Sequence, residues 1–239
     1  MFGLQASSKS PVYQPLITAE NALVGQSKSH SDGWGMVYFE QGVPHLVRGL
    51  KSAQEDTSFR RLAEGVSTNA LVAHLRRATV GEVSLLNCHP FQFGRWAMAH
   101  NGNLPEFQAM RAKLTEELEP HFLSNVFGTT DSEIYFALIL QELERSQILT
   151  EGAPAVSKCA SAFRRSVEKI EMIYQKARVT GDLSLNVILS NGSVMLGFRY
   201  HRELNFNCDL PSIEEGQKVT RFMLSSEPLT RDHTWHSLK

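Results

Sequence analysis

The stretch WAMAHNGNL, residues 96–104, joins the two patterns that decide the fold. Its first five residues form a short apolar run, which is typical of a buried strand. Asn101 and Gly102 follow directly and predict a tight turn. Residues 33–48 repeat this pattern, with two strand-like runs separated by a Gln-Gly turn. We therefore predict hairpins, and hence antiparallel sheets.

Strand patterns and helix patterns alternate along the rest of the chain. Strands are predicted over residues 33–39, 44–48, 71–75, 96–100, 183–189, 193–198 and 221–226. Residues 131–145 carry apolar side chains at helical spacing, and Thr130 with Glu133 fits a capping box at the start of that helix. A longer amphipathic helix is predicted from Ala155 to Ala177. The predicted fold class is α+β, with helices that cover antiparallel sheets.

The composition is that of an ordinary globular protein. The 239 residues are 42% hydrophobic and 21% charged, and the formal net charge is -1. This near-neutral balance gives no bias toward nucleic acid. No apolar run reaches the roughly 20 residues that a membrane-spanning helix needs. No linker or repeat divides the chain, so residues 1–239 are predicted to form one domain.

The cysteines bear on the location of the protein. Cys88, Cys159 and Cys208 are widely spaced and make no disulfide framework. The N-terminus has no basic start followed by an apolar stretch, as a secretory signal would have. We therefore expect three reduced thiols in a cytoplasmic protein.

Five short polar segments beside predicted turns are candidates for chemistry. They are residues 30–35 (HSDGWG), 74–79 (HLRRAT), 87–91 (NCHPF), 100–104 (HNGNL) and 129–133 (TTDSE). Each alone has a structural explanation. A histidine in an apolar run, such as His74, is more often part of the core, and Asp131 at a helix start is explained by capping. Zinc-ligand, phosphate-loop and GxSxG patterns are absent, so we expect no metal and no organic cofactor.

Together, in this order and spacing, the segments resemble the class II glutamine amidotransferases of the stand-alone type. The matching motifs are Asp-Gly-Trp-Gly, His-x-Arg-x-Ala-Thr, Asn-x-His-Pro-Phe, Ala-His-Asn-Gly-Asn-Leu and Thr-Asp-Ser-Glu. They run from residue 30 to residue 133, and a weaker similarity covers residues 225–229 (SSEPL). The resemblance implies the N-terminal-nucleophile (Ntn) hydrolase fold. That fold is a four-layer αββα sandwich of two mainly antiparallel sheets flanked by helices.

The resemblance also implies a reaction. In this family a cysteine at the mature N-terminus attacks the side-chain amide of glutamine or of a related γ-glutamyl amide, and its free α-amine serves as the base. Ammonia or an amine leaves, and water then hydrolyses the γ-glutamyl thioester. The implied partner is a small glutamine-like or γ-glutamyl substrate, with no cofactor, no nucleic acid and no membrane.

By the same resemblance, individual residues have expected roles. Asn101 offers its side-chain amide, and Gly102 its backbone N–H, to the oxyanion. Arg76 binds the substrate α-carboxylate, with neighbouring Arg77 as the alternative, and Asp131 binds the α-ammonium group. The residues expected to assist binding, or to line or support the pocket, are His30, Gly33, Trp34, His74, Thr79, His89 and His100.

The chain departs from the family at its start. The family begins with cysteine after the initiator methionine, whereas this sequence begins Met1-Phe2-Gly3. Stand-alone members often begin with Cys, Arg and an apolar residue before Phe-Gly. We therefore expect the nucleophile two residues upstream of Met1. We also expect that relatives continue beyond Lys239.

Three functions remain open on the sequence alone. The first is a glutamine or γ-glutamyl amide hydrolase whose nucleophile lies upstream of Met1. The second is a catalytically inactive γ-glutamyl-binding regulatory protein on the same fold. The third is an ammonia-supplying subunit of a synthase complex. Cys88, beside His89, is the alternative nucleophile within the chain, although it lacks a terminal amine.

Overall fold

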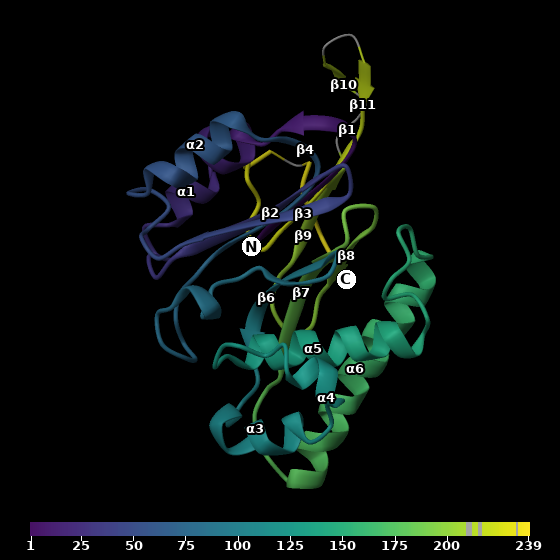
Figure 1. Cartoon of the computed structure of the whole chain (residues 1–239). Helices are drawn as coiled ribbons and strands as arrows, with labels where there is room; N and C mark the ends of the chain where they lie inside the picture. The colour runs from purple at the N-terminus through teal and green to yellow at the C-terminus, as the bar shows by residue number, and fades with distance from the viewer. Residues whose placement is uncertain (209–211, 215–216, 233) are drawn as a thin grey trace.

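Two antiparallel sheets form the centre of the structure, a computed structural model that describes residues 1–208, 212–214, 217–232 and 234–239. The larger sheet contains, in order, β13 (His236–Ser237), β9 (Asn205–Cys208), β12 (Arg221–Ser225), β1 (Phe2–Pro11), β4 (Ser67–Leu75), β2 (Trp34–Glu40) and β3 (Val43–Gly49). The smaller sheet contains β5 (Phe91–Phe93), β6 (Trp96–Asn103), β7 (Ser184–Ser190) and β8 (Met195–Phe198). The hairpin of β10 (Ser212–Glu214) and β11 (Gln217–Val219) stands apart from both sheets (Figure 1).

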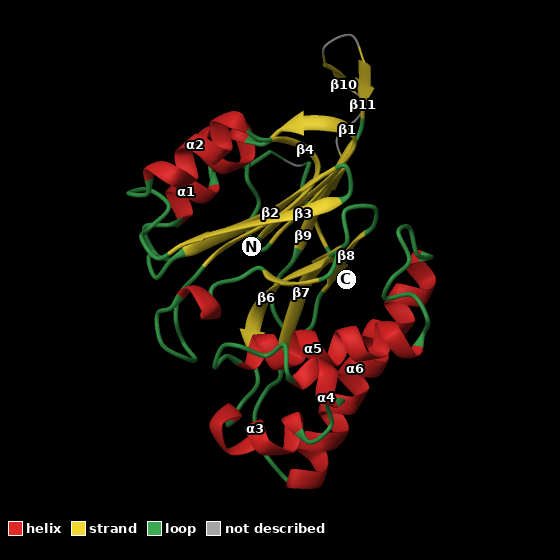
Figure 2. Cartoon of the chain, in the orientation of Figure 1, coloured by secondary structure: helices red, strands yellow, loops and turns green. Residues whose placement is uncertain are grey.

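Helices cover the outer face of each sheet. Helices α1 (Leu23–Gln26) and α2 (Thr57–Gly65) lie over the larger sheet (Figure 2). The smaller sheet is covered by α3 (Phe107–Thr115), α4 (Pro120–Leu123), α5 (Asp131–Arg145) and α6 (Val156–Ala177). Short helical turns at Gln14–Thr18 and Leu85–Asn87 complete the elements. The order of layers is helix, sheet, sheet, helix, so the expected αββα sandwich is confirmed.

The alternation of side chains along β1 sets which residues meet between the sheets. Phe2 is buried with Phe59 of α2 on the helix side of the larger sheet. Met1 is buried instead with Ile188 of β7, on the side that faces the smaller sheet. Gly3 lies on that same side, because a Cβ there would come within 2.9 Å of Ile188 Cγ2. Odd-numbered positions at this end of β1 therefore point between the sheets.

Most of the predicted elements are confirmed. The hairpin of β2 and β3 turns at Gln41 and Gly42, whose φ angles of 51° and 78° are left-handed. The two predicted helices are α5, with unchanged bounds, and α6, which begins one residue later at Val156. Strand β1 was not predicted. Its sequence FGLQASSKSP is too polar to read as a buried strand, although its neighbours β4 and β12 bury its first half.

The turn predicted at Asn101-Gly102 is wrong. Strand β6 continues through Asn103, and Asn101 pairs with Asn186 of β7. The partner strand supplies the hydrogen bonds that keep these residues extended, and local turn preference does not prevail against them. The oxyanion candidates therefore lie within a sheet and not in a flexible turn.

The capping prediction for α5 is half confirmed. Thr130 Oγ1 accepts a hydrogen bond from Glu133 N at 3.4 Å, as an N-cap residue does. The Glu133 carboxylate does not bond back to Thr130 but accepts from Phe127 N at 3.0 Å and Gly128 N at 2.6 Å. These bonds tie the loop before α5 to its first turn, which fixes the place of Asp131.

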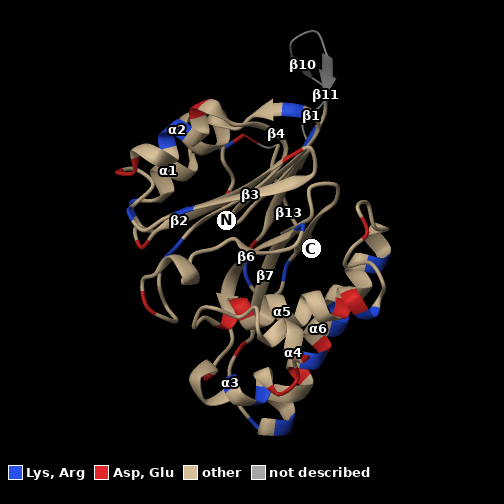
Figure 3. Ribbon diagram, viewed as in Figure 1, with Lys and Arg blue, Asp and Glu red and all other residues tan. Residues whose placement is uncertain are grey.

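The surface carries both signs of charge. Lys, Arg and Glu residues are interspersed along α6 (Figure 3). Within the described part of the chain, no helix combines the length and the apolar character needed to cross a bilayer.

Candidate active site

A cavity of about 1050 Å³ opens between the sheets at the start of β1. Met1, the end of β4, the end of β6 and the first turn of α5 all contribute to its wall. Six residues that the sequence assigned to the substrate or the oxyanion line it, namely Arg76, Thr79, His100, Asn101, Gly102 and Asp131. Arg77, His30, His74 and His89 line it as well. Segments that are far apart in the sequence thus meet at one site.

The structure does not bring Gly33 and Trp34 to this cavity. Trp34 lies on the opposite face of the larger sheet, where its Nε1 donates to Asp56 Oδ2 at 2.9 Å. Its ring packs edge-on against Phe59 and is 1% exposed. Gly33 supports the site through its backbone, since its carbonyl accepts from Arg76 N at 2.8 Å. Trp34 is thus a core residue in the structure.

Arg76 lines the cavity and carries a buried hydrogen-bond donor without a partner in the described part of the chain. Its side chain is buried, and Nη2 donates to Glu82 O at 2.8 Å and to Val80 O at 3.3 Å. Its Nη1 has no hydrogen-bond partner among the described residues. Leaving a buried donor unpaired is costly, and a carboxylate is its strongest partner.

Asp131 is a buried carboxylate at the N-terminus of α5. Its Oδ2 accepts from Leu104 N at 2.8 Å and its Oδ1 from Ser132 N at 2.8 Å. These two bonds fix the orientation of the carboxylate in the first turn of α5. Each oxygen can accept further bonds, so the carboxylate is suited to hold an ammonium group in the cavity.

Asn101 and His100 point to opposite faces of β6. Asn101 lies on the same face as Ala97 and Ala99, which pack toward the larger sheet. His100 lies on the helix side, where Nε2 bonds with Ser184 O at 2.9 Å and Nδ1 with Ser132 Oγ at 2.8 Å. Both ring nitrogens of His100 are therefore used to brace β6 against β7 and α5.

Gly102 is required by the approach of β7. A Cβ at this position would collide with the carbonyl oxygen of Ser184 on the paired strand. A glycine here lets the two strands approach closely beside Asn101.

Two further histidines form an uncharged wall of the cavity. The rings of His74 and His89 are 4.5 Å apart. His74 Nδ1 and both ring nitrogens of His89 have no hydrogen-bond partner among the described residues. Burial, reinforced by neighbouring histidines, lowers the pKa of both rings well below 6.5, and Arg48 and Arg76 act in the same direction on His89. Both rings are therefore neutral at pH 7.

Acid is expected to destabilise the fold through His74 and His89. Since their folded pKa values lie below the unfolded value of about 6.5, the unfolded state takes up protons first. Lowering the pH from about 7.5 to about 5.5 should reduce the free energy of unfolding by about 1.4 kcal/mol for each ring. Urea unfolding at the two pH values measures this loss. An unchanged pH dependence in the double variant His74→Gln, His89→Gln would contradict it.

The start of β1 is held against the segment that follows β12. The Met1 α-amine donates to Ser226 Oγ at 2.9 Å, and Ser226 N donates to Met1 O at 3.1 Å. Burial lowers the pKa of this amine to about 6, although Glu227 nearby acts to raise it.

Cys88 does not reach the cavity. It is fully buried, and its Sγ lies near Gly33. Burial raises the pKa of its thiol, although Arg76 and Arg48 oppose this shift. A buried thiol with a raised pKa is a poor nucleophile, so the structure does not favour Cys88 as the attacking group.

Two cavity residues had no signal in the sequence. Arg202 and Glu203 lie in the loop between β8 and β9 and line the cavity. Their segment, HRELN, carries no motif and no periodicity that marks a site. Only the folding of β8 and β9 onto separate sheets brings them beside β1.

Comparison with known proteins gives consistent results. Residues 17–239 match the family described as glutamine amidotransferases class-II. The chain is 29% identical over 235 residues to the probable glutamine amidotransferase DUG3 of Saccharomyces cerevisiae, covering 84% of this chain and 65% of the yeast protein. It is 35% identical over 74 residues to the gamma-glutamyl-hercynylcysteine sulfoxide hydrolase of Mycobacterium tuberculosis, covering 30% of this chain and 32% of that protein. The matched part therefore spans less than two thirds of either relative.

A solved structure shares the fold. The glutamine aminotransferase class-II domain protein from Silicibacter pomeroyi superposes with a TM-score of 0.67 at 20% identity. The superposition covers 100% of this chain and 91% of that structure.

Proposed function

Because the chain belongs to the class-II glutamine amidotransferase family, we propose that it is a hydrolase of glutamine or of γ-glutamyl amides. One observation carries the proposal. Arg76, Asp131 and Asn101 line one cavity, which β1 enters at its start. The first two complement the α-carboxylate and the α-ammonium group of a glutamyl head group. Asn101 lies where an oxyanion donor is needed.

The proposed nucleophile is a cysteine two residues before Met1. Alternation along a strand gives that residue the same orientation as Met1, toward the cavity between the sheets. Continuing the register in which Phe2 pairs with Ala73 places it opposite Arg76. The residue immediately before Met1 would instead point to the helix side. The alternation of faces along β1 therefore supports a cysteine two residues before Met1, as the family motif implies, and not one residue before it.

The reaction follows from these positions. The cysteine sulfur forms a bond to the γ-carbonyl carbon, and the α-amine of the same residue takes the thiol proton. Asn101 and the Gly102 N–H stabilise the oxyanion that develops. The C–N bond breaks, and the departing amine takes the proton. Water then attacks the thioester, releasing glutamate and restoring the thiol.

Substitution of Arg76 tests the head-group site without any need for turnover. Arg76→Ala is expected to weaken binding of L-glutamine and L-glutamate by about 1.5–3 kcal/mol, because a charge-assisted bond is lost. Isothermal calorimetry measures the two dissociation constants. Arg77→Ala is the matched control, since Arg77 follows directly and also lines the cavity. The proposal fails if the wild-type protein binds neither ligand. The assignment to Arg76 fails if only Arg77→Ala weakens binding.

The same proposal covers partners and location. The protein acts on a small substrate. It hydrolyses glutamine without a partner protein. An ammonia-supplying subunit would need its synthase for turnover, which steady-state assays of the lone protein reveal.

We further propose one domain in the cytoplasm, in keeping with the widely spaced cysteines.

A further inference from the structure

The cavity has two sides, which lie to either side of β1. Strand β4 neighbours β1 on one side, and Arg76 directly follows β4. Strand β12 neighbours β1 on the other side, and Glu227 lies just beyond β12. Arg202 lies on this second side, in the loop that leads into β9, the next strand beyond β12. Arg76 and Arg202 therefore line the cavity on opposite sides of β1.

The loop that carries Arg202 is held firmly to β7. Asn186 is fully buried, and its Nδ2 donates to Arg202 O at 2.8 Å and to Glu203 O at 3.1 Å. Its Oδ1 accepts from Tyr200 N at 2.9 Å and from Arg202 N at 3.3 Å. Asn186 is also the register partner of Asn101. The oxyanion candidate and the loop are thus positioned by one residue pair.

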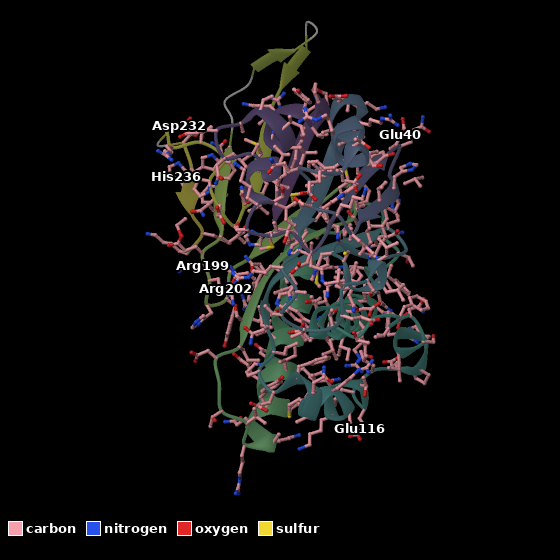
Figure 4. The ribbon with its side chains drawn as sticks, turned by 90° about the vertical axis from the view of Figure 1, so that its left-hand side faces the viewer. Glu40, Glu116, Arg199, Arg202, Asp232 and His236 are labelled. Atoms are coloured by element: carbon pink, nitrogen blue, oxygen red, sulfur yellow. The ribbon has the colours of Figure 1, made fainter. Side chains whose placement is uncertain are left out.

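The Arg202 side chain is oriented but leaves its terminal nitrogens free. Its Nε donates to Ser184 Oγ at 3.0 Å, which fixes the direction of the guanidinium group. Neither terminal nitrogen has a hydrogen-bond partner among the described residues. Arg202 and Arg199 lie close together at one edge of the molecule (Figure 4), but only Arg202 lines the cavity.

We propose that Arg202 binds a carboxylate on the leaving group, so that γ-glutamyl amino acids and γ-glutamyl peptides are better substrates than glutamine, which is still hydrolysed. A planar guanidinium group with two free nitrogens matches a carboxylate. Among the described cavity residues, Arg202 is the one Lys or Arg on this side of β1. The other charged residues on this side, Glu203 and Glu227, repel a carboxylate, so Arg202 is the group that can bind one. This assignment rests on the proposed γ-glutamyl amide hydrolysis.

The size of the cavity agrees with a substrate larger than glutamine. Its volume of about 1050 Å³ is at the upper end of sites that hold drug-sized ligands, which are about 300–1,000 Å³. A γ-glutamyl head group fills only the Arg76 side. The released products are glutamate and a free amino acid or peptide, with one water consumed.

A pair of ligands that differ only in the carboxylate tests the assignment. γ-Glutamylglycine and γ-glutamylethylamide have the same length, but only the first ends in a carboxylate. The wild-type protein is expected to bind γ-glutamylglycine about fivefold more tightly, as calorimetry measures it. Arg202→Gln should abolish this preference and leave the affinity for the ethylamide unchanged. Arg60→Gln is the matched control, because Arg60 lies on α2 and does not line the cavity.

The outcomes separate this inference from the function on which it rests. Equal affinity for the two ligands in wild type, or an unchanged preference in Arg202→Gln, overturns the role of Arg202 and leaves γ-glutamyl binding intact. Loss of the preference in Arg60→Gln to the same extent also overturns it. Binding of neither ligand by wild type overturns the proposed function itself. Arg202→Lys should retain part of the preference, since lysine keeps the positive charge but lacks the two terminal nitrogens that bind both carboxylate oxygens.

Discussion

Extending the chain so that a cysteine lies two residues before Met1 is expected to give glutamine hydrolysis, whereas a cysteine one residue before Met1 should give none. Met1 packs between the sheets and Phe2 packs against α2, so successive upstream residues alternate between these faces. Two chains of equal length and composition make the comparison. One begins Cys-Ala-Met1 and the other Ala-Cys-Met1, each after removal of the initiator methionine. Both have a free α-amine, but only the first has a thiol that faces the cavity.

The expected difference in turnover is on the order of 10⁴-fold or more, because removal of a nucleophile from a catalytic set costs up to about 10⁶-fold. A chain that begins Ser-Ala-Met1 is the control for the thiol. Glutamate release from glutamine is the measurement. Equal activity of the two cysteine chains would show that the alternation of faces along β1 does not decide where the nucleophile lies. An inert Cys-Ala chain that still binds glutamine would exclude the proposed nucleophile position.

Asn101→Ala in the active Cys-Ala chain is expected to lower kcat by about 100- to 1,000-fold with little change in KM. An oxyanion donor acts on the charge that develops in the transition state, so its loss affects the chemical step more than binding. Asn103→Ala is a matched control. Asn103 is two residues further along β6, on the same face, and also lines the cavity.

Single-turnover measurements separate acylation from the later hydrolysis of the thioester. We expect the loss in Asn101→Ala to appear in acylation, and Asn103→Ala to change the rate only a few-fold. A kcat for Asn101→Ala within a factor of about five of the parent would remove Asn101 from the oxyanion site.

The fold was predictable where local patterns and tertiary packing agree. The hairpin of β2 and β3 and the apolar face of α6 arise from periodic sequences that are buried as their period requires. Strand β1 was not predictable, because its burial comes from β4 and β12, which are distant in the sequence. The prediction of a turn at Asn101-Gly102 was wrong for the same reason, since pairing with β7 keeps those residues extended.

The sequence motifs predicted which segments form the site. They did not predict which face of its strand each side chain occupies. The resemblance brought Arg76, Asn101 and Asp131 together, and the structure places all three on one cavity. Trp34 belongs to the same motif set, yet one step along β2 turns its side chain to the opposite side of the sheet. Arg202 carries no motif at all, and only the three-dimensional arrangement indicates a role for it.

The N-terminal sequence and intact mass of the untagged protein, made from its own gene, test the central claim most directly. The claim is that a terminal cysteine on β1 supplies both nucleophile and base. It predicts a mature chain that begins with cysteine two residues before Met1. A mature chain that begins at Met1 or Phe2 would contradict it, because the cysteine that supplies the thiol would then be missing from the cavity.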